Sequence, residues 1–368
     1  MDTPGAGLGY LREYNDALVM GLARTAPQFD RSSIAAATGL TPQAVSKVLA
    51  RLAGDGLIEP AGVRRRGVGK PATIYRIVPS SRYAIGVHVT RTRVRLVLTD
   101  LLGEVVAGEV VSLPDDFTPE QLLSRVDAAR EELLRRRPVD PARILGLGIG
   151  MVGPLDHANG IVRDAHRLRH WHDVPLRELA AKRLLMPVHL DKDVTAGVTA
   201  EAWRRGGDFR DGVLIMVESG IGAGLWLAGA AYRGTHTNAG EFGHTVVQFD
   251  GPRCVCGRRG CLEVLHDRAV AGGDVPLAAR LLGVGVVNLL QTTDVGHVVL
   301  AGTDLLPHHD LYVEEVASAI RVQVPRADWL TVTVSVSALG GDVIAAGAAM
   351  QVLNAAHGRP SLDGGLGR

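Results

Sequence analysis

The chain has 368 residues. This length exceeds what a single hydrophobic core usually supports, so we expect two or three domains. Apolar residues make up 46% and charged residues 21%, which excludes a disordered or fibrous protein, and the net charge of +1 favours no particular partner. The polar N-terminus and the lack of an apolar run near the ~20 residues of a bilayer span predict a soluble, cytoplasmic protein with no membrane partner.

Basic residues are concentrated near the N-terminus. Residues 1–80 contain ten Lys/Arg against six Asp/Glu, and residues 41–76 contain seven against two. A basic patch confined to one small segment is typical of a nucleic-acid contact, and a solvated basic face is the alternative interpretation.

The apolar pattern of residues 1–78 predicts a winged helix-turn-helix domain. A short helix from about Ser32 to Thr38, with Asp30 or Ser32 as its N-cap, precedes a tight turn at Gly39-Leu40. A second helix follows over Thr41–Ala53, and its apolar residues at helical spacing are Val45, Val48, Leu49 and Leu52. Two short strands around a basic turn at residues 64–71 then form the wing.

The outward face of the 41–53 helix and the tip of the wing are the candidate DNA contacts. Their short, polar or basic side chains can reach base edges and phosphates. They are Thr41, Gln43, Ala44, Ser46, Lys47 and Arg51 on the helix, and Arg64, Arg65, Arg66 and Lys70 in the wing. A helical protein-interaction module with a solvated loop is the alternative.

After a linker at residues 78–82, residues 83–368 predict a mixed α/β domain. Apolar strands at residues 85–89 and 94–98 are followed by a strand at 104–111, a helix of about 18 residues from Pro119, and a strand at 144–149. Strand pairs separated by a helix indicate α/β architecture.

The three cysteines fall within eight residues and predict a metal site. Cys254, Cys256 and Cys261, with the imidazole of His244 upstream, supply four soft ligands that suit a closed, structural Zn²⁺ site. Three unligated thiols, or a redox pair with a spare cysteine, are the alternatives. Metal at this position is expected to make the loop that carries Glu241 and Glu263 rigid.

The chain resembles the ROK family (repressors, open reading frames and sugar kinases). The residues that carry the resemblance are Gly220-Ile-Gly-Ala-Gly224, Asn238-Ala-Gly-Glu-Phe-Gly-His244 and Cys254-Val-Cys-Gly-Arg-Arg-Gly-Cys-Leu-Glu263. The winged segment resembles the family's repressor branch, which includes glucose, N-acetylglucosamine and xylose regulators. The resemblance implies an actin-like ATPase (sugar kinase, ribonuclease H-like) fold of two α/β lobes with a zinc loop.

The phosphate loop of the family's kinases is altered here. The resemblance aligns their DxGGT motif with His88-Val89-Thr90-Arg91-Thr92, so both glycines have become larger residues. Phosphate must approach the backbone of such a turn closely, and side chains at Thr90 and Arg91 obstruct it. We therefore expect no ATP binding and no enzymatic activity, with Asp193 at the position of the kinase base.

The resemblance also implies a ligand pocket. Gly153, Glu241, His244 and Glu263 match family positions, whereas Lys192 and Arg167 replace neutral residues. Cations are not required by sugar hydroxyls, which suggests an anionic effector such as a sugar phosphate. The alternative is a pocket that has lost its ligand, with Lys192 paired to Asp193 or Glu201.

The sequence is therefore interpreted as a nucleoid-associated repressor of carbohydrate metabolism. It would bind double-stranded operator DNA as a homodimer or homotetramer, and a sugar or sugar phosphate would modulate its affinity. A sugar kinase that carries a DNA-binding module and a ligand-independent DNA-binding regulator are the alternative functions.

Overall fold

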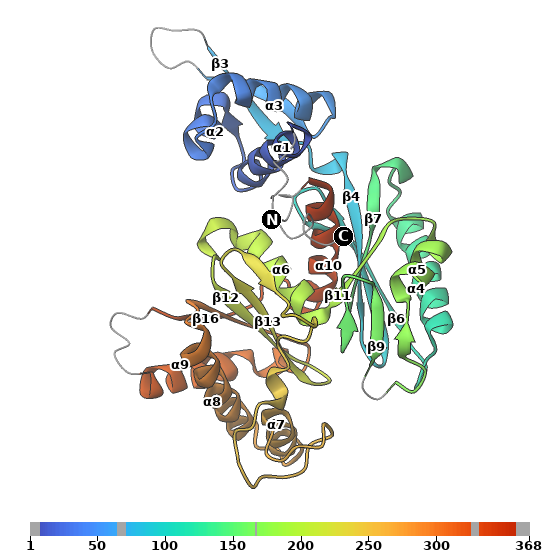
Figure 1. The fold of residues 1–368 in the computed structure, drawn as a ribbon, viewed down its shortest axis with the longest axis vertical. Coiled ribbons are helices and arrows are strands. Elements are labelled where there is room, and N and C mark those ends of the chain that lie inside the picture. Colours follow the sequence, from blue (N-terminus) through green and yellow to red (C-terminus); the bar gives the residue numbers. More distant parts are fainter. Residues whose placement is uncertain (1–7, 65–70, 166–167, 325–330, 358–368) are drawn as a thin grey trace, which may run out of the picture.

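The computed structural model describes residues 8–64, 71–165, 168–324 and 331–357. Figure 1 shows a small N-terminal unit beside the chain's two larger lobes, which lie on either side of a pair of central helices.

The N-terminal unit combines short helices with a small antiparallel sheet of order β1-β3-β2. Its elements are α1 (Leu8–Arg24), β1 (Phe29–Asp30), α2 (Arg31–Thr38), α3 (Pro42–Gly54), β2 (Ile58–Arg64) and β3 (Ala72–Ile77). The Asp30 carboxylate caps α2 by accepting from the Ser33 amide, and Gly39 ends that helix with φ of 71°. The Thr41 hydroxyl caps α3 by accepting from the Ala44 amide. The helices expected at 32–38 and 41–53 are thus confirmed to within about a residue.

The apolar stripe of α3 forms the core of this unit. Its four expected residues, Val45, Val48, Leu49 and Leu52, are buried against α1 and the sheet. Leu101, from the turn after β5, joins the same cluster. The expected linker at 78–82 is a 3-10 turn, η1 (Pro79–Ser81), in which the Pro79 carbonyl accepts from the Leu101 amide at 3.0 Å. The N-terminal unit is therefore packed on the first lobe.

The first lobe has a sheet of order β11-β7-β4-β5-β6, in which β11, β7 and β4 are parallel. Its strands are β4 (Tyr83–Val89), β5 (Arg93–Asp100), β6 (Val105–Ser112), β7 (Ile144–Met151) and β11 (Val188–Lys192). The helices α4 (Pro119–Arg136) and α5 (Leu176–Leu184) cover one face, and α4 has the 18 residues expected from Pro119. A small sheet of β8 (Leu155–Asp156), β9 (Ile161–Asp164) and β10 (His172–Val174) extends this lobe.

The second lobe has a sheet of order β14-β13-β12-β15-β16. Its elements are β12 (Gly212–Val217), β13 (Ile221–Leu227), β14 (Ala230–Tyr232), α7 (Leu262–Ala271), α8 (Val275–Thr293), β15 (His297–Ala301), α9 (His309–Gln323) and β16 (Thr333–Val336). The helices α8 and α9 pack on this sheet through a shared apolar cluster.

One helix, α8, is long and apolar enough to be compared with a membrane span. By length and composition α8 could cross a membrane, with a mean hydropathy of 1.4, although no such segment was expected. Its apolar residues pack against β12, β15, α7 and α9, so a position in the core of the lobe explains the composition.

Two helices, α6 (Asp193–Arg205) and α10 (Val343–His357), lie between the sheets and form a third apolar cluster with both (Figure 1). They touch at backbone distance, because a Cβ added to Gly347 would lie 1.8 Å from the Ala196 carbonyl oxygen. Any side chain at position 347 would force the two helices apart.

Candidate functional site

An inner cavity of about 130 Å³ lies where the two lobes meet. The ends of β4 and β11, the start of α6, the β12–β13 turn and the start of α7 supply its walls. Its volume is close to the ~150 Å³ of an engineered cavity that holds one benzene ring. The site therefore has room for about one six-membered ring.

The predicted ligand residues are brought together here, with one exception. Those that line the inner cavity are Gly153, Lys192, Asp193, Glu241, His244 and Glu263. Arg167 lies outside the described residues, so its predicted role stays a prediction. These six residues are spread over more than 100 positions of the sequence and come together only in the fold.

Lys192 does not face the cavity as an uncompensated cation. Its Nζ donates to Glu241 Oε1 at 2.6 Å and to the Ala239 carbonyl at 3.0 Å, and the residue is 4% exposed. The partners considered from sequence, Asp193 and Glu201, are both wrong. Glu201 instead accepts from Arg205 at 2.9 Å and from Ser337 at 2.6 Å. Two of the predicted ligand residues therefore neutralise each other.

The imidazole of His88 lies deep in the site, where its Nε2 is 3.9 Å from Glu218 Oε2 and it interacts electrostatically with Asp193. Burial raises the pKa of Asp193, and the nearby His88 opposes that shift. Burial lowers the pKa of His88 to about 4, so its imidazole is neutral at physiological pH. Glu263 completes the deep wall, where its Oε2 accepts from the Ile221 amide at 3.0 Å.

A carboxylate that sequence reasoning missed lies on the side expected to hold phosphates. Glu218 lines the cavity at the start of the glycine-rich β12–β13 turn, together with Thr90 and Arg91. Its Oε1 accepts from Thr303 Oγ1 at 2.7 Å and lies 3.5 Å from Arg93 of the first lobe. An acidic residue directly before Ser219-Gly220 was visible in the sequence and is a signal against phosphate binding.

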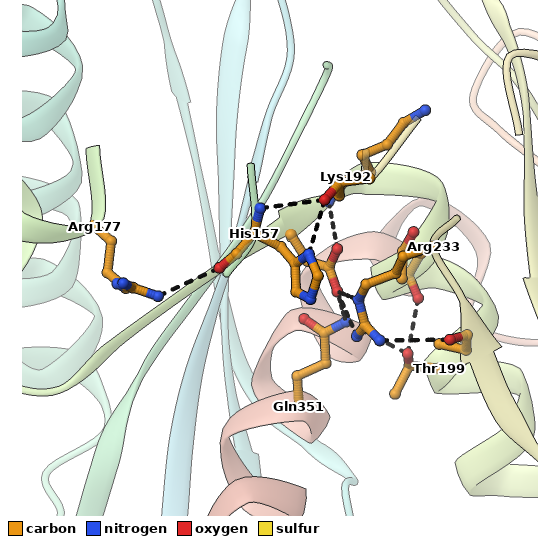
Figure 2. Close-up of polar contacts among 10 residues, drawn as sticks. His157, Arg177, Lys192, Thr199, Arg233 and Gln351 are labelled. Atoms are coloured by element: carbon orange, nitrogen blue, oxygen red, sulfur yellow. Dashed lines mark hydrogen bonds and ion pairs between the residues drawn. The ribbon is translucent and has the colours of Figure 1, made fainter. Parts of the chain in front are cut away.

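A second set of polar contacts joins the lobes beside the cavity (Figure 2). Arg233, after β14, donates to Asp191 Oδ2 from Nε at 2.9 Å and from Nη2 at 2.7 Å, and Gln351 of α10 donates to the same oxygen at 2.8 Å. His157 Nδ1 lies 2.8 Å from Thr237 Oγ1, and burial lowers the pKa of His157. The loop between β14 and Glu241 is thus fastened to the first lobe at several points.

An outer cavity of about 840 Å³ adjoins the inner one at Glu241 and His244. The β8–β9 hairpin and the loop at residues 235–238 form two walls, and Cys256 and Arg258 of the cysteine-containing loop form a third. The two cavities are therefore contiguous, and residues of the cysteine cluster line the outer one.

The predicted metal ligands form a compact cluster. The donor atoms of His244, Cys254, Cys256 and Cys261 all lie within 4.8 Å of one another. His244 Nδ1 is 3.6 Å from Cys254 Sγ, and Cys256 Sγ is 3.6 Å from Cys261 Sγ. A tetrahedral ion with metal–sulfur bonds of about 2.3 Å separates its sulfur ligands by about 3.8 Å. The spacing and softness of these donors therefore fit such an ion, with His244 bound through Nδ1.

The candidate DNA residues of α3 divide into two groups. Gln43 and Lys47 are exposed on the outer face of the helix. Arg51 instead pairs with Asp16 of α1, with Nε donating at 3.1 Å, and Ser46 donates to the Pro42 carbonyl at 2.8 Å. Sequence reasoning did not anticipate that Arg51 would have an internal partner.

The predicted wing is described only in part. Arg64, at the end of β2, has its guanidinium 3.6 Å from the buried Asp30 carboxylate and is otherwise half exposed. Arg65, Arg66 and Lys70 lie outside the described residues. Of the remaining predicted contacts on α3, Thr41 serves as the cap and Ala44 is half-buried.

A model of the ROK family matches residues 84–271, just over half of the chain. The xylose repressor of Caldicellulosiruptor bescii is 28% identical over 254 residues, which are 69% of this chain and 63% of the relative. The DNA-binding transcriptional repressor Mlc of Escherichia coli is 26% identical over 264 residues, with the same two coverages. The chain thus spans just under two thirds of the length of these relatives.

The crystal structure of a ROK family transcriptional regulator, a homologue of E. coli Mlc, superimposes with a TM-score of 0.75. That alignment covers 94% of this chain and 97% of the other at 21% identity, so it shows a shared fold. The family match and this fold confirm the expected actin-like domain of two lobes.

Proposed function

The chain belongs to the ROK family, and from that premise we propose that it is a sugar-responsive transcriptional repressor. Residues 1–78 form its winged helix-turn-helix domain, and residues 83–368 bind the effector. The protein binds double-stranded operator DNA as a homodimer or homotetramer, so that two α3 helices reach half-sites about one helical turn apart.

The observation that carries the proposal is the presentation of α3. Its apolar stripe is buried, its N-terminus is capped by Thr41, and Gln43 and Lys47 project from the exposed side. A recognition helix reads base edges with residues of its first turns, as Gln43 can do with adenine, while Lys47 can reach a phosphate. Because Arg51 and Arg64 have internal carboxylate partners, we expect smaller contributions from them.

The inner cavity supports a neutral sugar better than a sugar phosphate. The expectation of an anion rested on Lys192 and Arg167, and the charge of Lys192 is balanced by Glu241. Carboxylate oxygens from Glu241, Glu263 and Glu218 also line the site. Such oxygens accept hydrogen bonds from ring hydroxyls and repel a phosphate.

We infer that phosphoryl transfer has been lost. The side chains of Thr90 and Arg91 stand where a phosphate loop needs bare backbone, and Glu218 adds a negative charge beside them. The bridge from Arg93 through Thr303 to Glu218 crosses the same side of the cleft. These features support a regulator rather than a kinase.

We also propose that His244, Cys254, Cys256 and Cys261 hold a structural Zn²⁺. With four protein ligands the ion has no open position for water, so it supplies rigidity and no hydrolytic chemistry. The Arg258 guanidinium donates to the His244 carbonyl at 3.3 Å and lines the outer cavity. Zinc thereby supports the wall that carries Glu241.

Fluorescence anisotropy with fragments of the protein's own genomic neighbourhood tests the function. The arms of the titration are D-xylose, D-glucose and D-glucose 6-phosphate, with Lys47→Ala as the binding variant and Arg125→Ala on α4 as the charge-matched control. We expect specific binding, reduced by Lys47→Ala and relieved by a neutral sugar. Binding that no metabolite changes would favour the ligand-independent regulator, and sugar-dependent ATP consumption would favour the kinase.

A further inference from the structure

Trp203, in the last turn of α6, touches all three parts of the molecule. It belongs to a helix that packs on the second sheet, and its Nε1 donates to the Leu102 carbonyl of the first lobe at 2.8 Å. The guanidinium carbon of Arg24, the last residue of α1, lies 3.7 Å from the centroid of the Trp203 ring. This cation–π contact joins α6 to the N-terminal unit.

The opposite end of α6 lies in the inner cavity. Lys192 is the N-cap of the helix and Asp193 its first residue, and both line the cavity. Ten residues separate Asp193 from Trp203 along the helix, so about 15 Å lie between the cavity and Trp203 at a rise of 1.5 Å per residue. A Cβ added to Gly224 of β13 would lie 2.0 Å from the Val194 carbonyl oxygen, which fixes α6 to the second sheet at backbone distance.

The N-terminal unit is attached to the first lobe instead. The chain runs from β3 through η1 directly into β4, and Leu101 of the first lobe is part of the apolar cluster of the N-terminal unit. The unit and the first lobe therefore move together. A displacement of the second lobe, on whose strands β12 and β13 α6 packs, strains the contacts that the end of α6 makes with Leu102 of the first lobe and with Arg24.

The Arg24–Trp203 contact is easily broken, because the burial of Arg24 is costly. Among the described residues, no partner accepts from its buried Nη1, and burial lowers the pKa of the guanidinium to about 10. A buried guanidinium nitrogen without an acceptor is unfavourable, and a cation–π contact offsets only part of that cost. An interface built only for stability would place a carboxylate beside this guanidinium.

We propose that the contact of Arg24 with Trp203 transmits the state of the inner cavity to the N-terminal helices. Ligand binding at Lys192, Asp193 and Glu241 displaces α6 with the second lobe, and loss of the Arg24–Trp203 contact frees α1, which packs on α3. The purpose of this coupling rests on the proposed function. Its existence does not, because it is a property of the free protein.

Hydrogen–deuterium exchange tests the coupling without DNA or sugar. Glu241→Gln breaks the ion pair with Lys192 at the cavity end, and Arg24→Met removes the cation while it keeps an unbranched apolar stem. Trp203→Phe is a second, milder variant that keeps a ring. Arg204→Met is the matched control, since Arg204 is in the same helical turn but pairs with Glu104 at 3.2 Å.

We expect Glu241→Gln to accelerate exchange of the α1 amides at least about 5-fold relative to those of α4, the lower end of typical coupling between sites. In the Arg24→Met or Trp203→Phe background the same substitution should leave α1 unchanged, whereas the Arg204→Met background should keep the full effect. An equal acceleration in the Arg24→Met background would overturn the proposal. So would an unchanged α1 when the loop at residues 235–241 exchanges faster.

The outcome is independent of the anisotropy experiment, since a protein that binds neither DNA nor sugar still shows the exchange effect. If both proposals hold, Arg24→Met retains sugar binding and loses most of the sugar's effect on DNA affinity.

Discussion

His88 gives the inner cavity a pH dependence whose sign and size follow from its burial. The pKa of the imidazole falls from 6.5 to about 4 in the folded protein, chiefly through burial. As the pH falls below 6.5 the unfolded chain binds a proton at this position and the folded chain does not. His88 therefore lowers stability as the pH falls from about 7 toward 4, and the loss is complete below 4.

The size of the effect follows from the two pKa values. At 1.36 kcal/mol per pKa unit, the gap between 6.5 and about 4 corresponds to about 3 kcal/mol when both states have titrated. At pH 5, where only the unfolded state is protonated to a large extent, linkage gives a loss of about 2 kcal/mol relative to pH 8. Other histidines that are half-buried, such as His157 and His357, have lowered pKa values and add to the total slope.

Urea unfolding at pH 8, 6.5 and 5, in wild type and His88→Gln, isolates this contribution. We expect His88→Gln to lose about 2 kcal/mol less than wild type between pH 8 and 5. His236→Gln, which removes an exposed imidazole from the loop at residues 235–238, should follow the wild-type curve. If the free energies of unfolding of wild type and His88→Gln fall equally between pH 8 and 5, water reaches His88 and the account of the deep site is wrong.

The remaining predictions concern the ion pair, the DNA face and the metal. In urea unfolding, Glu241→Gln should lower the free energy of unfolding by about 3 kcal/mol because it leaves a buried ammonium without its partner. Lys192→Met should lower it by less, because the Glu241 side chain is about a third exposed. Additive losses in the double variant would contradict the pairing. In anisotropy titrations at increasing salt, Lys47→Ala should reduce the slope of log K against log salt concentration by about 1. Arg51→Ala should mainly lower thermal stability. Equal salt slopes for Lys47→Ala and wild type would contradict a phosphate contact. Cys256→Ser should bind less than one zinc per chain, as measured by atomic absorption, and should have a lower melting temperature. A chelator should destabilise wild type but not the variant. A full equivalent of zinc in Cys256→Ser would exclude this residue as a ligand.

The parts of the molecule set by neighbours in sequence were predictable. The Asp30 and Thr41 caps, the turn at Gly39 and the α4 helix from Pro119 depend on contacts within a few residues, and the structure has each of them. The cysteine cluster is of the same kind, because its ligands lie within one short loop apart from His244. Local chemistry decides such features before any tertiary contact forms.

The charge pairs were not predictable, because their partners are distant in sequence. Lys192 and Glu241 are 49 residues apart, and Arg51 and Asp16 are 35 apart. A list of charged residues allows many pairings, and only the tertiary packing of helices and lobes selects one. The expectation of an anionic effector depended on the charge of Lys192, so the identity of its partner changes the preferred ligand class.

Three consecutive residues, the last two of β11 and the first of α6, lie at the junction of the lobes. Asp191 accepts from Arg233 and Gln351, Lys192 pairs with Glu241, and Asp193 interacts electrostatically with His88. A sugar that binds through Glu241 must share or displace the Lys192 ammonium, so the free energy of the ion pair opposes ligand affinity, tenfold for each 1.4 kcal/mol. That same free energy becomes available to move the second lobe relative to the first. A weak effector that loosens this junction therefore changes lobe position more than a tight ligand that leaves the pair intact.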